Sequence, residues 1–188
     1  MKNLKLIFFI FSLLSYSQNN FTSARSIEIS ENNYEEQLRS SIVKNIELTN
    51  IGPSVMSGRV TDLEVNPNNP TEFYVAYASG GLWHTKNNGT TFSPIMDNSM
   101  TQNIGDFAID WKSNSIYVGT GESNSSRSSY PGIGILKSID NGKSWENIGL
   151  RDTHHISRII INPNDNQHVV VAAIGHLYSA NNQSCLLY

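Results

Sequence analysis

The chain contains the stretch Ser138-Ile139-Asp140-Asn141-Gly142-Lys143-Ser144-Trp145, and it has the same pattern of residue types earlier, in Thr85-Lys86-Asn87-Asn88-Gly89-Thr90-Thr91-Phe92. In both stretches a hydroxyl residue precedes an Asp or Asn, a Gly, a second hydroxyl residue and an aromatic residue. Asp and Asn accept hydrogen bonds from backbone N–H groups across a tight turn, and Gly adopts a backbone conformation that other residues avoid. Each stretch therefore predicts a hairpin turn, and the recurrence indicates a repeat protein.

The recurring side chains of these two stretches are predicted to be structural. A carboxylate that accepts turn N–H bonds has a lowered pKa and poor access to a substrate, which argues against Asp140 as a catalytic acid. The residues to which we assign this structural role are Thr85, Asn87, Gly89, Phe92, Ser138, Asp140, Gly142 and Trp145.

The repeat is longer than the turn. Residues 59–92, 104–145 and 156–179 each contain short β-branched or aromatic runs separated by Asn, Pro, Asp and Gly, which is typical of strands and turns. A four-stranded unit of roughly 40–50 residues is the size of a β-propeller blade, and it fits better than a β-sandwich or a parallel β-helix. We expect an all-β fold with two full propeller blades and part of a third, and an insertion at Ser123–Gly132 in the second unit.

The N-terminus is typical of a secretory signal peptide. Lys2 and Lys5 precede the apolar run 6–14, and small residues follow at 15–17. The run is too short to span a bilayer comfortably. We therefore expect a signal peptide over residues 1–17 and a product that is secreted, or located in the periplasm or on the surface of a bacterium.

Three further segments complete the predicted organisation. Residues 18–50 form a lead-in, in which Tyr34, Leu38 and Ile42 recur every four residues; an amphipathic helix over 33–44 and a flexible lead-in both fit this pattern. Residues 51–183 form the blades. Because a propeller usually has about 4–8 blades, we expect the chain to be the N-terminal fragment of a longer protein, with residues 184–188 as an aberrant tail.

The composition of the chain limits the kinds of partner and cofactor that it can bind. The net charge is −3 and no basic cluster occurs, so nucleic-acid binding has no electrostatic basis. The single Cys185 cannot form an internal disulfide. His154, His155 and His176 lack a supporting ligand set, so we predict no metal and no cofactor. After the signal peptide, no segment predicts a membrane span.

Several short motifs resemble a known group of proteins. Ser57-Gly58-Arg59-Val60, Gly80-Gly81-Leu82-Trp83, Gly119-Thr120-Gly121-Glu122 and the stretch from Gly132 to Ser138 resemble exported bacterial proteins with BNR (Asp-box) repeats. These proteins are labelled glycosyl hydrolase BNR-repeat or sortilin-N-terminal-like. The resemblance covers about residues 50–182 and implies a β-propeller. It does not imply one activity, because Asp boxes occur in sialidases, xyloglucanases, photosystem assembly factors and sortilin receptors alike.

Two hydrolase mechanisms of this group find no support. The xyloglucanase pattern places a catalytic Asp just before Gly80-Gly81, and Ala78 stands at that position. Sialidases need an arginine triad and a Phe-Arg-Ile-Pro-like motif; Arg59, Arg127 and Arg158 are present, but the motif is not. Catalytic residues therefore remain unassigned.

Aligning the units gives a candidate ligand-binding set. One polar residue recurs at an equivalent position on the expected innermost strand of each unit, near the central channel, and a carboxylate opens the insertion loop. These candidates are Asp62, Asp106, Arg158 and Glu122. The residues that follow the first three are expected to face the packing between blades, and they are Leu63, Phe107 and Ile159.

Two functions fit this set. The first is a scaffold that binds a glycan or a protein or peptide and has no catalysis of its own. The alternative is the N-terminal part of a glycoside hydrolase acting on polysaccharide, which needs two carboxylates flanking one bond; Asp62, Asp106 and Glu122 are then the candidates.

Overall fold

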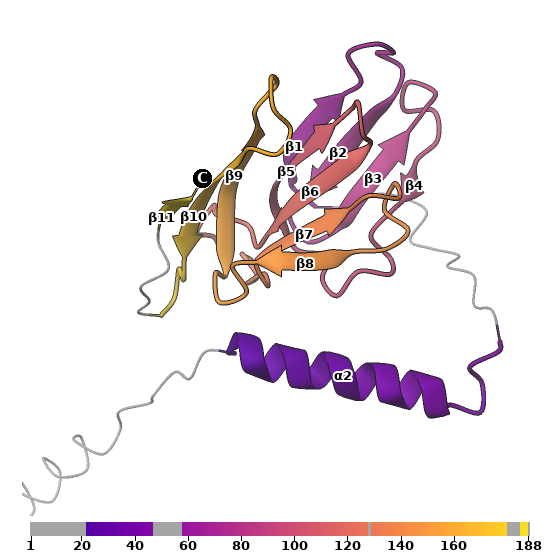
Figure 1. Ribbon diagram of the computed structural model, residues 1–188, viewed down its shortest axis with the longest axis vertical. Coiled ribbons are helices and arrows are strands. Elements are labelled where there is room, and N and C mark those ends of the chain that lie inside the picture. Colours follow the sequence, from indigo (N-terminus) through magenta and orange to yellow (C-terminus); the bar gives the residue numbers. More distant parts are fainter. Residues whose placement is uncertain (1–21, 47–57, 128, 180–184, 188) are drawn as a thin grey trace, which may run out of the picture.

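The computed structural model describes residues 22–46, 58–127 and 129–179, and the backbone of 185–187. Its strands form three antiparallel sheets, each built from strands consecutive in sequence (Figure 1). The first sheet contains β1 (Val60–Val65), β2 (Phe73–Tyr77), β3 (Gly81–Thr85) and β4 (Ser93–Pro94). The second contains β5 (Ile104–Asp110), β6 (Ser115–Thr120), β7 (Ile135–Ser138) and β8 (Glu146–Gly149). The third contains β9 (His155–Ile161), β10 (Val169–Gly175) and β11 (Cys185–Leu187).

The predicted strand units are confirmed as two four-stranded antiparallel sheets of identical strand order, as in propeller blades. The β6–β7 connection, residues 121–134, is much longer than the β2–β3 connection, residues 78–80, in agreement with the expected insertion. β11 lies within the segment expected to be an aberrant tail, and it pairs with β10 as the next strand of the third sheet.

The hairpins at residues 85–92 and 138–145 share a hydrogen bond that closes the turn. Asn87 Oδ1 accepts from the Thr91 backbone N–H at 2.9 Å, and Asp140 Oδ1 accepts from the Ser144 N–H at 2.9 Å. Hydrogen bonds from the Ser144 hydroxyl and backbone lower the pKa of Asp140 to about 2, so this carboxylate is ionised and engaged in the turn. Gly142 has a φ of 83°, which only glycine adopts without strain.

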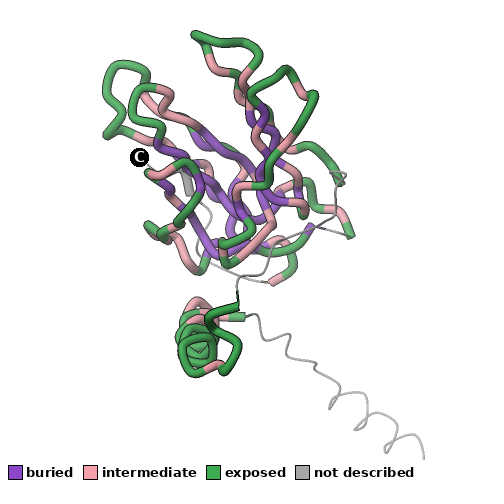
Figure 2. Tube along the Cα trace, turned by 90° about the vertical axis from the view of Figure 1, so that its right-hand side faces the viewer, coloured by how far each residue is buried: buried purple, intermediate pink, exposed green. Residues whose placement is uncertain are grey.

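The core lies between the sheets, whose strands are mostly buried while the connecting loops are exposed (Figure 2). Phe107 on β5 packs with Tyr74 and Leu82 of the first sheet. Ile159 on β9 packs with Tyr117 of the second sheet, among other residues. β5 and β9 therefore each pack apolar side chains against the preceding sheet.

Leu63 does not follow this pattern. The prediction that its side chain packs against a neighbouring sheet is wrong for the described residues. Its side chain is 48% exposed, whereas the equivalent Phe107 and Ile159 are buried. In the described part of the chain, no sheet precedes β1 in sequence. The position has the apolar residue that the repeat predicts, but its partner surface is not among the described residues.

The lead-in contains helix α2 (Ala24–Ser40), which begins and ends earlier than the helix considered over 33–44. Ser23 caps it, because the Ser23 hydroxyl accepts from the Ser26 N–H at 3.3 Å. Tyr34 and Leu38 are exposed rather than packed on a sheet. The helix contacts the blades at its N-terminal end, where the Ala24 N–H donates to Asp152 Oδ1 at 2.9 Å.

No helix in the described ranges is long and apolar enough to cross a membrane. The expected signal peptide, residues 1–17, lies outside the described residues.

Candidate functional site

The three polar residues aligned from the repeats lie together. Arg158 Nη1 is 3.3 Å from Asp106 Oδ1 and 4.0 Å from Asp62 Oδ2. Their strands β1, β5 and β9 do not pair with one another, since each is an edge strand of a different sheet. The cluster thus connects the first strands of three consecutive sheets through side chains.

A β-bulge explains why these side chains meet. The pairing register shifts just before each residue, between Val60 and Asp62 on β1 and between Ile104 and Asp106 on β5. The same shift occurs on β9, where Ala172 faces Arg158 and Ala173 faces Ile156. A bulge re-aims the side chain that follows it. The repeat of the bulge therefore gives the three polar residues equivalent directions.

Asp106 is the buried member of the cluster, with 2% of its surface exposed. Its Oδ2 accepts from the Ile159 N–H at 2.6 Å. Burial, and after it the nearby Asp62 carboxyl, raise the pKa of Asp106 to about 7 despite the Ile159 bond and Arg158. Asp62 Oδ2 is buried and accepts no hydrogen bond from the described residues. Protonation of Asp106 removes the repulsion between its carboxyl group and that of Asp62.

This raised pKa predicts a pH effect that Asp106→Asn should remove. The folded state binds the proton more tightly than the unfolded chain, whose Asp titrates near 3.8, so the stabilisation is full below that pH and is lost as pH rises through about 7. We expect the free energy of unfolding of D106N to rise relative to that of the wild type by roughly 2–3 kcal/mol between pH 5 and pH 8, at about 1.4 kcal/mol per pH unit up to about pH 7. Urea denaturation at the two pH values measures this change. A difference between the variants that stays constant with pH would contradict the raised pKa of Asp106.

The accessible group of the cluster is Arg158. Its side chain is 58% exposed, whereas those of Asp62 and Asp106 are largely covered. A ligand at this end of the strands would meet a guanidinium, which offers several N–H donors in a fixed plane. The arrangement is suited to binding an acceptor-rich ligand. It does not place the carboxyl of raised pKa within reach of a substrate.

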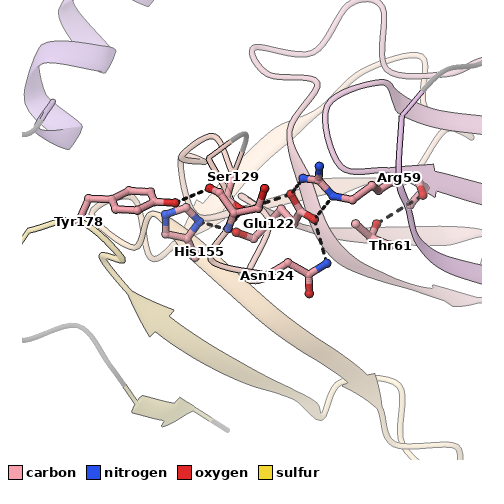
Figure 3. A network of polar contacts seen from close by, with 9 residues as sticks. Arg59, Thr61, Glu122, Asn124, Ser129, His155 and Tyr178 are labelled. Carbon is pink, nitrogen blue, oxygen red and sulfur yellow. Dashed lines mark hydrogen bonds and ion pairs between the residues drawn. The ribbon is translucent and has the colours of Figure 1, made fainter.

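Glu122 belongs to a separate set of contacts (Figure 3). It is 1% exposed. Its carboxylate accepts from Arg59 Nε at 2.7 Å and from Arg59 Nη2, from Asn124 Nδ2 at 3.0 Å and from the Ser129 hydroxyl at 3.4 Å. The Arg59 bonds hold its pKa below the ordinary value. Since Arg59 directly precedes β1, this ion pair connects the first sheet to the β6–β7 connection of the second.

Residues of the third sheet, and of the segment that follows it, also contact the β6–β7 connection. His155 Nδ1 lies 2.7 Å from the Glu122 backbone oxygen, and because a carbonyl only accepts, Nδ1 carries the proton. Burial lowers the pKa of His155, which favours this neutral form. The Tyr178 hydroxyl donates to the Ser126 oxygen at 2.5 Å (Figure 3). Arg59, His155 and Tyr178 therefore position the β6–β7 connection. These contacts could not be predicted, because no local pattern relates positions so far apart in the chain.

Two further histidines lie face to face near this connection. His154 and His176 stack with ring centroids 3.6 Å apart. Within the described ranges, no group of three or more His, Cys, Asp or Glu side chains is arranged to hold a metal ion.

Comparison with known proteins gives a limited result. No protein-family model and no curated protein matches the chain. Among solved structures, the chain is similar to an ancestral GH74 enzyme, with 16% identity over 61% of this chain and a TM-score of 0.47. It is also similar to the GH74 xyloglucanase from Xanthomonas campestris, with 16% identity over 59% of this chain and a TM-score of 0.44. The match spans 16% and 18% of those enzymes, respectively.

Proposed function

We propose that this chain forms the first blades of an exported β-propeller that binds a glycan, and that its own residues carry out no catalysis. In this proposal residues 1–17 direct export and residues 51–183 build the blades. The repeated sheets support the propeller, and the exposed Arg158 guanidinium supports ligand binding at the inner strands.

The proposal of a non-catalytic role rests on one observation. The two most buried candidate carboxylates already form ion pairs and hydrogen bonds within the protein. Glu122 is paired with Arg59, and Asp106 is bound to Arg158 and the Ile159 N–H. A glycoside hydrolase needs two carboxyl groups that reach opposite sides of one substrate bond. Groups that are 1–2% exposed do not reach a substrate.

A glycoside hydrolase remains the second candidate because of Asp106. A carboxyl whose pKa rises to about 7 beside a second carboxyl is the usual arrangement of a general acid. This candidate requires that the cluster open and expose Asp106 when the substrate binds.

The test is binding of xyloglucan and a panel of other polysaccharides, measured by isothermal titration with the purified full chain. We expect binding that Arg158→Ala weakens about tenfold, a loss of about 1.4 kcal/mol. Arg39→Ala is the matched control, because Arg39 is an exposed arginine on α2. Absence of binding to every polysaccharide, or equal binding by R158A and R39A, would contradict the proposal.

A further inference from the structure

A cavity of about 380 Å³ lies between the first and second sheets, away from the Arg158 cluster and from Glu122. Its lining comes from β2, β3 and the two Asp-box hairpins, and from the turn that joins β5 to β6. These hairpins are at the opposite end of the strands from the β6–β7 connection that carries Glu122. The volume is within the roughly 300–1,000 Å³ of small-molecule sites.

Aromatic rings form one wall of the cavity. Tyr74 stacks on His84 with ring centroids 3.9 Å apart and planes 3° from parallel, and Trp111 lies 5.7 Å from Tyr74 at a tilt of 58°. Trp111 is only half-buried, so part of its ring is available to a ligand. The C–H bonds on one face of a sugar ring pack against such rings, because the aromatic face is electron-rich.

The charged groups around the cavity favour an anion. Lys86 and Lys143 bring two positive charges to the lining, against the single carboxylate of Glu72. That carboxylate is engaged, since it accepts from Asn66 Nδ2 at 2.8 Å and lies 3.0 Å from His84 Nε2. The local balance is therefore positive in a chain whose net charge is −3.

The turns also contribute polar side chains. Asn114 and Asn141 line the cavity, and both have a positive φ, of 57° and 61°. Asn141 and Lys143 belong to the same Asp box as Asp140, whose own carboxylate is engaged inside the turn. The hairpin thus uses Asp140 for structure and presents Asn141 and Lys143 to the cavity.

We propose that this cavity is a binding subsite for one acidic sugar residue, a uronate, whose ring packs on Trp111 and whose carboxylate lies between Lys86 and Lys143. A uronate uses both the exposed part of the aromatic wall and the two ammonium groups, because it combines a sugar ring with a negative charge. The subsite does not depend on Arg158, so it is independent of the function proposed above.

The test is titration of the full chain with glucuronate, followed by ligand-observed NMR, with glucose and acetate as matched probes. Glucose keeps the ring without the charge, and acetate keeps the charge without the ring. We expect glucuronate to bind at least about tenfold more tightly than either. If glucose bound as tightly as glucuronate, the lysines would have no role in binding. If acetate bound as tightly as glucuronate, the aromatic rings would have none. No binding of glucuronate would overturn the subsite.

Alanine substitutions of the two exposed lysines make the test specific, because neither substitution removes a buried contact. Lys86→Ala and Lys143→Ala should each weaken glucuronate binding about tenfold, while Lys44→Ala, on the lead-in, should leave it unchanged. Trp111→Ala should weaken glucuronate and glucose alike. Arg158→Ala should not affect any of these titrations, which separates this subsite from the polysaccharide binding proposed above. An equal effect of the three lysine variants would overturn the proposal.

Discussion

Replacing Glu122 with alanine is expected to lower the free energy of unfolding by about 3–5 kcal/mol. The Glu122 carboxylate is buried and accepts hydrogen bonds from Arg59, Asn124 and Ser129. Its loss leaves these donors without their acceptor and removes the ion pair that joins two sheets. Urea denaturation followed by tryptophan fluorescence measures the change.

The control for Glu122 is another Glu–Arg pair that is exposed. Glu35→Ala removes the partner of Arg39 on α2, where the two side chains are largely in solvent, and should change stability by less than about 0.5 kcal/mol. Arg59→Ala combined with Glu122→Ala should lose much less than the sum of the single losses, because both act through one interaction. A stable E122A variant that loses only ligand binding or turnover would show that Glu122 is functional rather than structural.

Gly105→Ala is expected to destabilise the protein by more than the roughly 1–3 kcal/mol of ordinary overpacking. A Cβ at Gly105 would lie 1.9 Å from the Ile156 carbonyl oxygen and 2.5 Å from that of Gly121. Both neighbours are backbone atoms, so β5 and β9 would have to separate. Gly105 is also the bulged residue that aims Asp106 toward Arg158. Thermal unfolding should therefore show a large loss in melting temperature.

Gly119→Ala is the comparison variant, because Gly119 also lies where the second and third sheets pack together. Its Cβ would meet the Ile156 side chain, at 2.4 Å from Cγ2, and a side chain can shift more readily than a carbonyl. We expect G119A to lose less stability than G105A. The reverse order, or no loss in G105A, would contradict the close packing of the second and third sheets.

Local patterns in the sequence were sufficient to predict the strands and turns. The Asp boxes are local, since each hydrogen bond joins residues within one hairpin. The equivalence of Asp62, Asp106 and Arg158 was also predictable, because it follows from aligning the repeats. Their contact required the bulges on β1, β5 and β9, which leave no clear mark in residue type.

Features that depend on distant partners were not predictable. The pairing of Glu122 with Arg59 joins different repeats, and the exposure of Leu63 depends on which sheet lies against β1. The cavity beside Tyr74 and Trp111 likewise forms between two sheets, so no pattern within one repeat indicates it. The helix of the lead-in begins at the Ser23 cap, a signal that the four-residue apolar spacing did not include.

The measurement that tests the central claim most directly is release of reducing ends from xyloglucan by the wild type, with D106N and E122Q as companions. If the candidate carboxylates serve structure and the chain only binds, no release above background occurs in any of the three proteins. Release by the wild type that is abolished in a folded D106N or E122Q variant would contradict the account and make that carboxyl group catalytic.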